Sequence, residues 1–251
     1  MLPAEEKPLL EIQGLRKHFG GVRAVDGVDL VIRAGELCCI IGPNGAGKST
    51  LFQLLSGQLL PTDGRIVFAG KDITRAQPFE RARLGIAVKV QSLGMFQDLT
   101  VDHNLRIPLM RRFRPDEVPY AIDQLLDRVG LRGLNAVRAR VLSHGQKQWL
   151  ALSMVLALEP KLLLLDEPTA GMSPEETRLT TQIIRMFNAR GSSVMVIEHD
   201  MAFVRQLEAP VVVMHLGRVF LRGTFGEVEM NEEVRHLYLG THRKRSEAKY
   251  V

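Results

Sequence analysis

This 251-residue sequence has only two cysteines and no long apolar run, which argues against a disulfide-stabilised protein and against a membrane-spanning one. The two cysteines, Cys38 and Cys39, are adjacent in the apolar run 37–41, where neighbouring side chains of a strand face opposite ways. They are predicted packing residues, with neither a disulfide framework nor metal-ligand spacing. No apolar run reaches the roughly 18 residues that a membrane span needs. Residues 1–6 also lack the basic and apolar regions of a secretory signal, so we expect any pore to belong to partner chains.

Aromatic residues are few as well, at 6% of the chain with one tryptophan and three tyrosines. The 33 basic residues are interspersed with 28 acidic ones, and basic clusters occur only locally, at 111–114 and 242–245. Binding of single-stranded nucleic acid typically combines a basic groove with an array of stacking aromatic side chains. The sequence has no such array, so we expect a solvated basic surface and no nucleic-acid partner.

The most informative segment present is 42–50, GPNGAGKST, which fits the phosphate-binding pattern G-x-x-x-x-G-K-[ST]. An apolar run at 37–41 predicts a buried strand before it, and residues 49–57 predict a helix after it. The glycines let successive backbone N–H groups point at a phosphate, and the helix N-terminus adds partial positive charge. Lys48 is predicted to reach the β- and γ-phosphates, and Ser49 to bind Mg²⁺.

Two further apolar runs predict central strands that end in acidic residues. Run 162–165 precedes Asp166 and Glu167, and run 194–197 precedes Glu198 and His199. Ligands of open α/β sheets bind beyond the carboxyl ends of the strands, so these groups are expected near the same phosphate. Asp166 is the predicted Mg²⁺ partner and Glu167 the predicted base for an attacking water. An Asp-Glu pair after an apolar run is by itself typical of a solvated strand end. Its occurrence together with the glycine-rich loop at 42–50 indicates a catalytic role.

Segment 142–146, LSHGQ, precedes a helical apolar pattern that ends at Glu159-Pro160. Ser143 is therefore predicted at a helix N-terminus, which is a ready anion site. With this segment the sequence resembles the nucleotide-binding subunits of ABC (ATP-binding cassette) transporters, over about residues 10–240. The motifs follow the family's order, which includes Gln91 after the next strand and His199.

The resemblance implies an α/β fold in which a P-loop NTPase core with a parallel sheet carries an N-terminal antiparallel β subdomain and an inserted helical subdomain. We expect one ABC ATPase domain over 1–251, with the ATP-binding core at 9–91 and 147–251. The helical subdomain is expected at 92–146 and ends in the signature motif. Within it, Thr100 is predicted to cap a helix through Leu109, and a second helix is predicted at 116–129. A hairpin is predicted at 211–221.

The resemblance also implies an ATPase that uses ATP and Mg²⁺. Its implied catalytic residues are Lys48, Gln91, Glu167 and His199. Its implied metal ligands are Ser49, Gln91 and Asp166. The implied nucleotide contacts are Phe19, Val25, Asn44, Gly45, Ala46, Gly47, Lys48, Ser49, Thr50, Ser143, Gly145 and Gln146. Among these, Phe19 matches the aromatic residue that stacks on adenine.

In similar proteins the signature serine of one subunit caps the ATP held by another, which implies a head-to-tail homodimer or a heterodimer with a paralogous ATPase. Two integral-membrane permease subunits and, indirectly, a solute-binding protein are the other implied partners. The implied place is the cytoplasmic face of the inner membrane.

His144 stands where glycine is usual, and together with the run 147–150 it resembles importers of branched-chain amino acids and of urea or short amides. Ser173 stands where many relatives have aspartate and is instead predicted to cap a helix with Pro174 and Glu176. Three alternatives stay open: a non-transport ABC ATPase of DNA repair or translation, a small-molecule P-loop kinase, and an inactive nucleotide-binding module.

Overall fold

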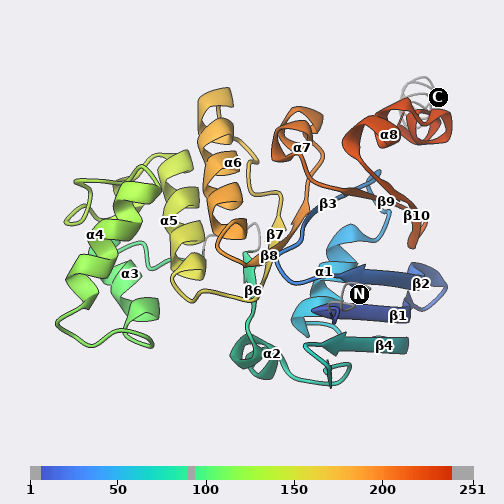
Figure 1. The fold of residues 1–251 in the computed structure, drawn as a ribbon, viewed down its shortest axis with the longest axis horizontal. Helices are drawn as coiled ribbons and strands as arrows, with labels where there is room; N and C mark the ends of the chain where they lie inside the picture. Colours follow the sequence, from blue (N-terminus) through green and yellow to red (C-terminus); the bar gives the residue numbers. More distant parts are fainter. Residues whose placement is uncertain (1–6, 90–93, 239–251) are drawn as a thin grey trace, which may run out of the picture.

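The computed structural model describes residues 7–89 and 94–238, and its strands form two sheets in that part of the chain (Figure 1). The first sheet is antiparallel, with order β2-β1-β4-β5. Its strands are β1 (Leu10–Phe19), β2 (Val22–Ile32), β4 (Asp63–Phe68) and β5 (Lys71–Asp72). The predicted antiparallel N-terminal region is thus confirmed.

The second sheet has the order β10-β9-β3-β8-β7-β6. Its strands are β3 (Leu37–Ile41), β6 (Ile86–Lys89), β7 (Leu162–Asp166), β8 (Ser193–Ile197), β9 (Val211–His215) and β10 (Arg218–Gly223). All neighbouring pairs are parallel except β9 and β10, which form an antiparallel hairpin. The predicted parallel core and the hairpin are both confirmed.

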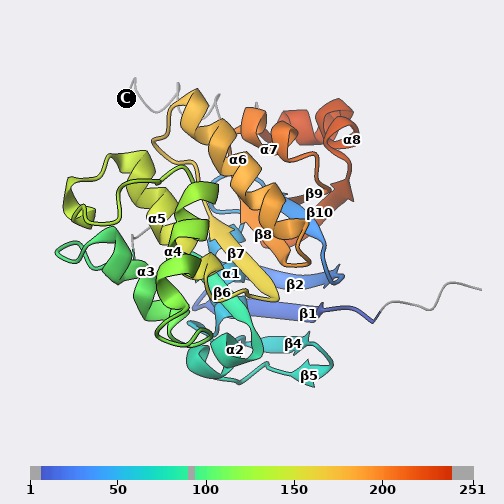
Figure 2. The same cartoon turned by 60° about the vertical axis from the view of Figure 1, so that its left-hand side comes forward.

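Helices cover both faces of the parallel sheet and form a separate group at one end. They are α1 (Lys48–Ser56), α2 (Pro78–Leu84), α3 (Val101–Leu109), α4 (Val118–Arg128), α5 (His144–Leu156), α6 (Pro174–Asn188), α7 (Met201–Leu207) and α8 (Phe225–Met230), with a 3₁₀ turn at Ala139–Val141. Figures 1 and 2 show α3 and α4 beside α5, at the end of the molecule opposite the antiparallel sheet. The predicted helical insertion is present there.

Two of the predicted helix starts are confirmed by their caps. The Thr100 hydroxyl accepts the His103 N–H at 3.2 Å. The Ser173 hydroxyl accepts the Glu176 N–H at 3.3 Å, and the Glu176 carboxylate accepts the Ser173 N–H at 2.8 Å. These bonds satisfy backbone donors that the first helical turn leaves without an intrahelical partner.

Two apolar clusters lie on opposite faces of β3. Cys38 belongs to the cluster shared with α1 and the antiparallel sheet, whereas Cys39 belongs to the cluster that runs through α5 to α3 and α4. Both thiols are buried and free, as predicted. Within the described residues, no helix has the length and apolar character required to cross a membrane.

Candidate functional site

The strand order brings the predicted motifs to one edge of the parallel sheet. Strand β3 pairs with β8, and β8 pairs with β7. The glycine-rich loop follows β3, Asp166 ends β7 and is followed by Glu167, and Glu198 follows β8. Because the carboxyl ends of parallel strands meet at one edge, segments more than 100 residues apart in sequence converge beside the N-terminus of α1.

The glycine-rich loop needs glycine for steric reasons at two positions. Gly42 has φ 149°, and a Cβ atom there would lie 2.2 Å from the Met214 carbonyl oxygen. Gly47 has φ 100°, and its Cβ would lie 2.2 Å from the Ala24 carbonyl oxygen. Any larger residue would displace the backbone that packs behind the loop.

Lys48 is 9% exposed and bends back over this loop. Its Nζ atom donates to the carbonyl oxygens of Gly42, at 2.6 Å, and Pro43, at 3.2 Å. Burial lowers the pKa of this amine, and the carboxylates of Glu167 and Asp166 partly offset that shift. A phosphate that binds in the loop would replace the two neutral carbonyl acceptors with anionic oxygens, which bind an ammonium group more strongly.

The other predicted nucleotide contacts differ in accessibility. Asn44, Gly45 and Ser49 are exposed, Gly47 and Thr50 are half-buried, and Ala46 is buried. Phe19, at the end of β1, is 47% exposed, with the Lys17 Nζ atom 5.1 Å from its ring centroid. Val25 is instead 0% exposed, so its side chain supports the loop from within the core and offers no surface to a ligand. For Val25 the geometry therefore disagrees with the prediction of a direct contact.

Asp166 presents a buried carboxylate oxygen, Oδ1, that has no hydrogen-bond partner among the described residues. Burial raises the pKa of this carboxyl group, and the neighbouring Glu167 raises it further. An unsatisfied buried carboxylate beside a phosphate loop fits a hard cation such as Mg²⁺. Ser49 is the other predicted ligand within the described residues, whereas Gln91 lies outside them.

The backbone of Glu167 has a constrained conformation. It lies in the left-handed region, with φ 47°, and its N–H donates to the Ile197 carbonyl oxygen at 2.9 Å. One carboxylate oxygen lies 3.5 Å from Nδ1 of His199, whose side chain is 64% exposed. The predicted base and the predicted histidine are thus neighbours.

Sequence reasoning missed the structural importance of Glu198, which is 1% exposed. Its Oε1 atom accepts the Thr169 hydroxyl at 2.6 Å and the Thr169 N–H at 3.2 Å, and its Oε2 atom accepts the His199 N–H at 3.1 Å. Glu198 therefore ties the loop after β7 to the loop after β8. An acidic residue directly after a continuous apolar run was the available signal.

Lys89, at the end of β6, was also missed. It is 5% exposed, and its Nζ atom has no hydrogen-bond partner among the described residues. Burial lowers its pKa to about 8, against the opposing effect of Asp166 and Glu198. The acidic edge of the sheet thus has a second buried cation besides Lys48.

The signature segment forms the N-terminus of α5, as predicted. The Ser143 hydroxyl accepts the Gln146 N–H at 3.2 Å, and the Gln146 side chain accepts the Ser143 N–H at 3.0 Å. His144 Nε2 lies 3.0 Å from the Ala170 carbonyl oxygen, to which it donates. A Cβ at Gly145 would lie 2.0 Å from a carboxylate oxygen of Glu176. The signature therefore packs against the segment that follows Glu167 in the same chain.

Comparison with known proteins agrees with this arrangement. Residues 25–170 match the family described as "ABC transporter". The chain is 32% identical, over 252 residues, to the high-affinity branched-chain amino acid transport ATP-binding protein BraF of Pseudomonas aeruginosa, with 93% of this chain and 98% of BraF covered. It is 38% identical, over 218 residues, to the methionine import ATP-binding protein MetN of Geobacillus kaustophilus, with 85% and 64% covered. The crystal structure of a nucleotide-free ATP-binding cassette from an ABC transporter superposes with a TM-score of 0.83 and 28% identity, and 92% and 99% of the two chains are covered.

Proposed function

Since the chain belongs to the ABC transporter family as an ATPase subunit, we propose that it powers the uptake of branched-chain amino acids, or of urea or short amides. The observation that carries the ATPase part of the proposal is the junction of the glycine-rich loop with Asp166, Glu167 and His199 at the ends of neighbouring strands. The name of BraF supports a branched-chain amino acid. His144 fits both importer groups, the run 147–150 favours the urea and amide branch, and the name of MetN adds methionine as a solute to test.

Each residue of the site has a proposed task in hydrolysis. Lys48 leaves the loop carbonyls and neutralises the β- and γ-phosphate oxygens, while Phe19 stacks on the adenine. Asp166, Ser49 and Gln91 hold Mg²⁺, which supplies charge neutralisation on the phosphates. Glu167 takes the proton of the attacking water, and His199 beside it contacts the γ-phosphate.

Completion of the site requires a second subunit. Ser143 is exposed at the N-terminus of α5, where its hydroxyl and the helix N-terminus offer donors to a phosphate of the partner's ATP. Gly145 permits close approach of the backbone. We propose a head-to-tail dimer of two copies, or of this chain with a paralogous ATPase, at the cytoplasmic face of the inner membrane. Two permease subunits bind it there and receive solute from a solute-binding protein.

Reconstitution with its permeases tests the proposal directly. The complex is placed in liposomes with internal MgATP and the binding protein outside, and uptake of labelled leucine, methionine, urea and acetamide is measured together with phosphate release. Uptake of leucine, urea or acetamide that Lys48→Ala abolishes would support the proposal, and uptake of methionine alone would overturn its solute assignment. ATP hydrolysis without uptake of any of the four would refute the solute assignment, and transfer of phosphate to an acceptor other than water would indicate a kinase.

A further inference from the structure

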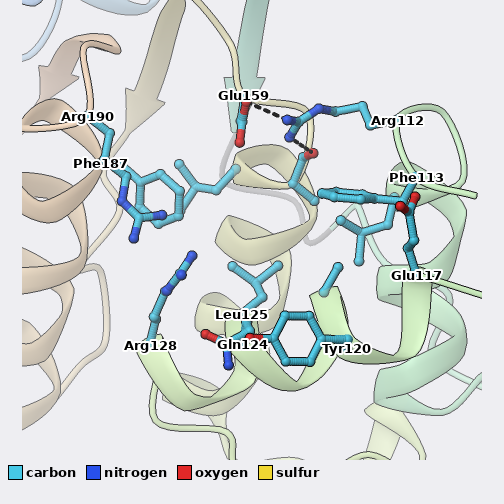
Figure 3. Close-up of a pocket in the computed structure, with 14 residues that line it drawn as sticks. Arg112, Phe113, Glu117, Tyr120, Gln124, Leu125, Arg128, Glu159, Phe187 and Arg190 are labelled. Atoms are coloured by element: carbon cyan, nitrogen blue, oxygen red, sulfur yellow. Dashed lines mark hydrogen bonds and ion pairs between the residues drawn. The ribbon is translucent and has the colours of Figure 1, made fainter.

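A cavity of about 330 Å³ lies between α4 and the carboxyl-terminal ends of α5 and α6 (Figure 3). None of the residues that line it belongs to the candidate nucleotide site. Its volume falls in the range of roughly 300–1,000 Å³ that is typical of small-molecule sites. The cavity thus has room for a ligand of its own.

The inner wall of the cavity is apolar. Leu109, Leu125, Leu156 and Phe187 line it and are each at most 6% exposed. The rings of Phe113 and Tyr120 stand at its edge in Figure 3. Such a wall favours a hydrocarbon or aromatic body over a strongly hydrated one.

The acidic residues of the cavity are already paired. Glu159 forms an ion pair with Arg112 at 2.5 Å, and Arg112 also donates to the Ala157 carbonyl oxygen at 3.3 Å. Glu117 accepts the Arg114 N–H at 2.9 Å and faces the Arg114 guanidinium at 3.5 Å. Neither carboxylate is therefore available to balance the remaining cations.

Those remaining cations are Arg128, the last residue of α4, and Arg190, which follows α6. Neither side chain forms an ion pair or a hydrogen bond with any described residue; Arg190 lies over the Phe187 ring at 5.7 Å. Figure 3 shows the two guanidinium groups extending toward one another beside that ring. The partial negative charge of a helix C-terminus stabilises a cation there, which explains why an arginine ends α4. It does not explain why the guanidinium group of Arg128 extends toward that of Arg190.

We propose that this cavity binds a small organic monoanion, with its acid group between Arg128 and Arg190 and its apolar body against Leu125 and Phe187. Guanidinium groups bind planar carboxylates through paired hydrogen bonds, and an anion between two of them removes their mutual repulsion. Because the two arginines come from the helical insertion and from the sheet-covering layer, the ligand would join these parts. The proposal does not depend on the transported solute.

Isothermal titration of the full chain tests the proposal, with MgADP at saturation so that the phosphate loop is already filled. The probes are 4-phenylbutyrate, its uncharged amide and acetate. We expect 4-phenylbutyrate to bind with a Kd of about 1 mM, as suits so small a ligand, and both other probes to bind at least about tenfold more weakly. The amide lacks the charge and acetate lacks the apolar body.

Variants locate the binding. Arg128→Gln and Arg190→Gln should each lower the affinity for 4-phenylbutyrate at least about fivefold. The corresponding lysine variants keep the charge but not the planar pair of guanidinium donors, and their affinity should fall less. Arg132→Gln is the matched control, since Arg132 pairs with Asp127 at 3.3 Å outside the cavity and should leave binding unchanged. Thermal unfolding checks that every variant is folded. Absence of binding at about 10 mM probe, equal binding of the amide, or equal binding by both glutamine variants and the parent would overturn the proposal.

Discussion

Replacement of Glu167 by glutamine should separate nucleotide binding from hydrolysis. The variant keeps the length and shape of the side chain, and its backbone N–H still donates to Ile197. Both residue types have the same cost at φ 47°, so the fold should be affected by less than about 0.5 kcal/mol. The loss of a proton acceptor should lower kcat about 10²- to 10⁴-fold, equivalent to about 2.7–5.4 kcal/mol in the barrier.

Binding should survive this change for an electrostatic reason. Glu167 raises the pKa of Asp166, so removal of its charge brings that pKa down and keeps the metal-binding carboxylate ionised. Removal of that charge also lowers the pKa of Lys48, but the two hydrogen bonds that place its Nζ atom in the loop go to the carbonyl oxygens of Gly42 and Pro43. We therefore expect an affinity for MgATP at least equal to that of the parent, and a dimer that forms with ATP and persists.

Three measurements check this prediction: phosphate release in a single turnover, equilibrium binding of a fluorescent ATP analogue, and size-exclusion chromatography with and without MgATP. Glu208→Gln is a matched control, because Glu208 is an exposed glutamate paired with Arg185 at 2.7 Å. If Glu167→Gln turns over at the parent rate, Glu167 is not the base. If it stays monomeric with MgATP and the paralogous ATPase present, the head-to-tail dimer is wrong.

Three other changes probe separate parts of the molecule. Lys48→Ala should abolish tight nucleotide binding because it deletes the cation of the loop; near-parent affinity in equilibrium dialysis would remove Lys48 from that task. Substitutions in segment 92–105, such as Phe96→Ser, should reduce transport while sparing ATPase activity of the isolated subunit. Phe96 is 55% exposed, and the membrane subunits of similar proteins dock near the glutamine loop, so we propose that the permeases bind here. Equal loss of both activities would indicate structural support only. Truncation after Thr241 should leave ATP hydrolysis unchanged, because every predicted catalytic motif lies earlier in the sequence. A large fall in the rate of phosphate release by the truncated variant would contradict this.

The elements predicted well from sequence were those with local signals. Ser143 and Ser173 begin helices whose caps need only residues three positions apart. Cys38 and Cys39 are buried in clusters on opposite faces of β3, which follows from the alternation of side chains along a single strand. Helix α2 had the same kind of signal, with Pro78 at its first turn and Glu80 closing a capping box with Gln77, and it was overlooked.

The features that were missed depend on contacts between distant segments. Glu198 becomes a structural acceptor only because β8 lies beside β7, which places Thr169 within reach. Lys89 resembles a solvated strand end in sequence, and its burial follows from the neighbours that the sheet order supplies. Val25 matches a family position, yet its burial depends on the apolar cluster that β2 shares with α1. No pattern within one segment contains this information.

The contact of His144 with Ala170 has a consequence for timing. In the proposed dimer, Ser143 serves the partner's ATP, while Glu167 serves the ATP of its own chain. Ala170 lies three residues after Glu167, and His144 directly follows Ser143. The hydrogen bond of 3.0 Å between His144 and Ala170 therefore connects the segment of the proposed base with the signature segment of the same subunit. The packing of Glu176 on Gly145 reinforces that link. In the proposed dimer, a rearrangement near Glu167 after the loss of one γ-phosphate would therefore meet, through Ala170 and His144, the segment that caps the other nucleotide, which would make the two hydrolytic events interdependent.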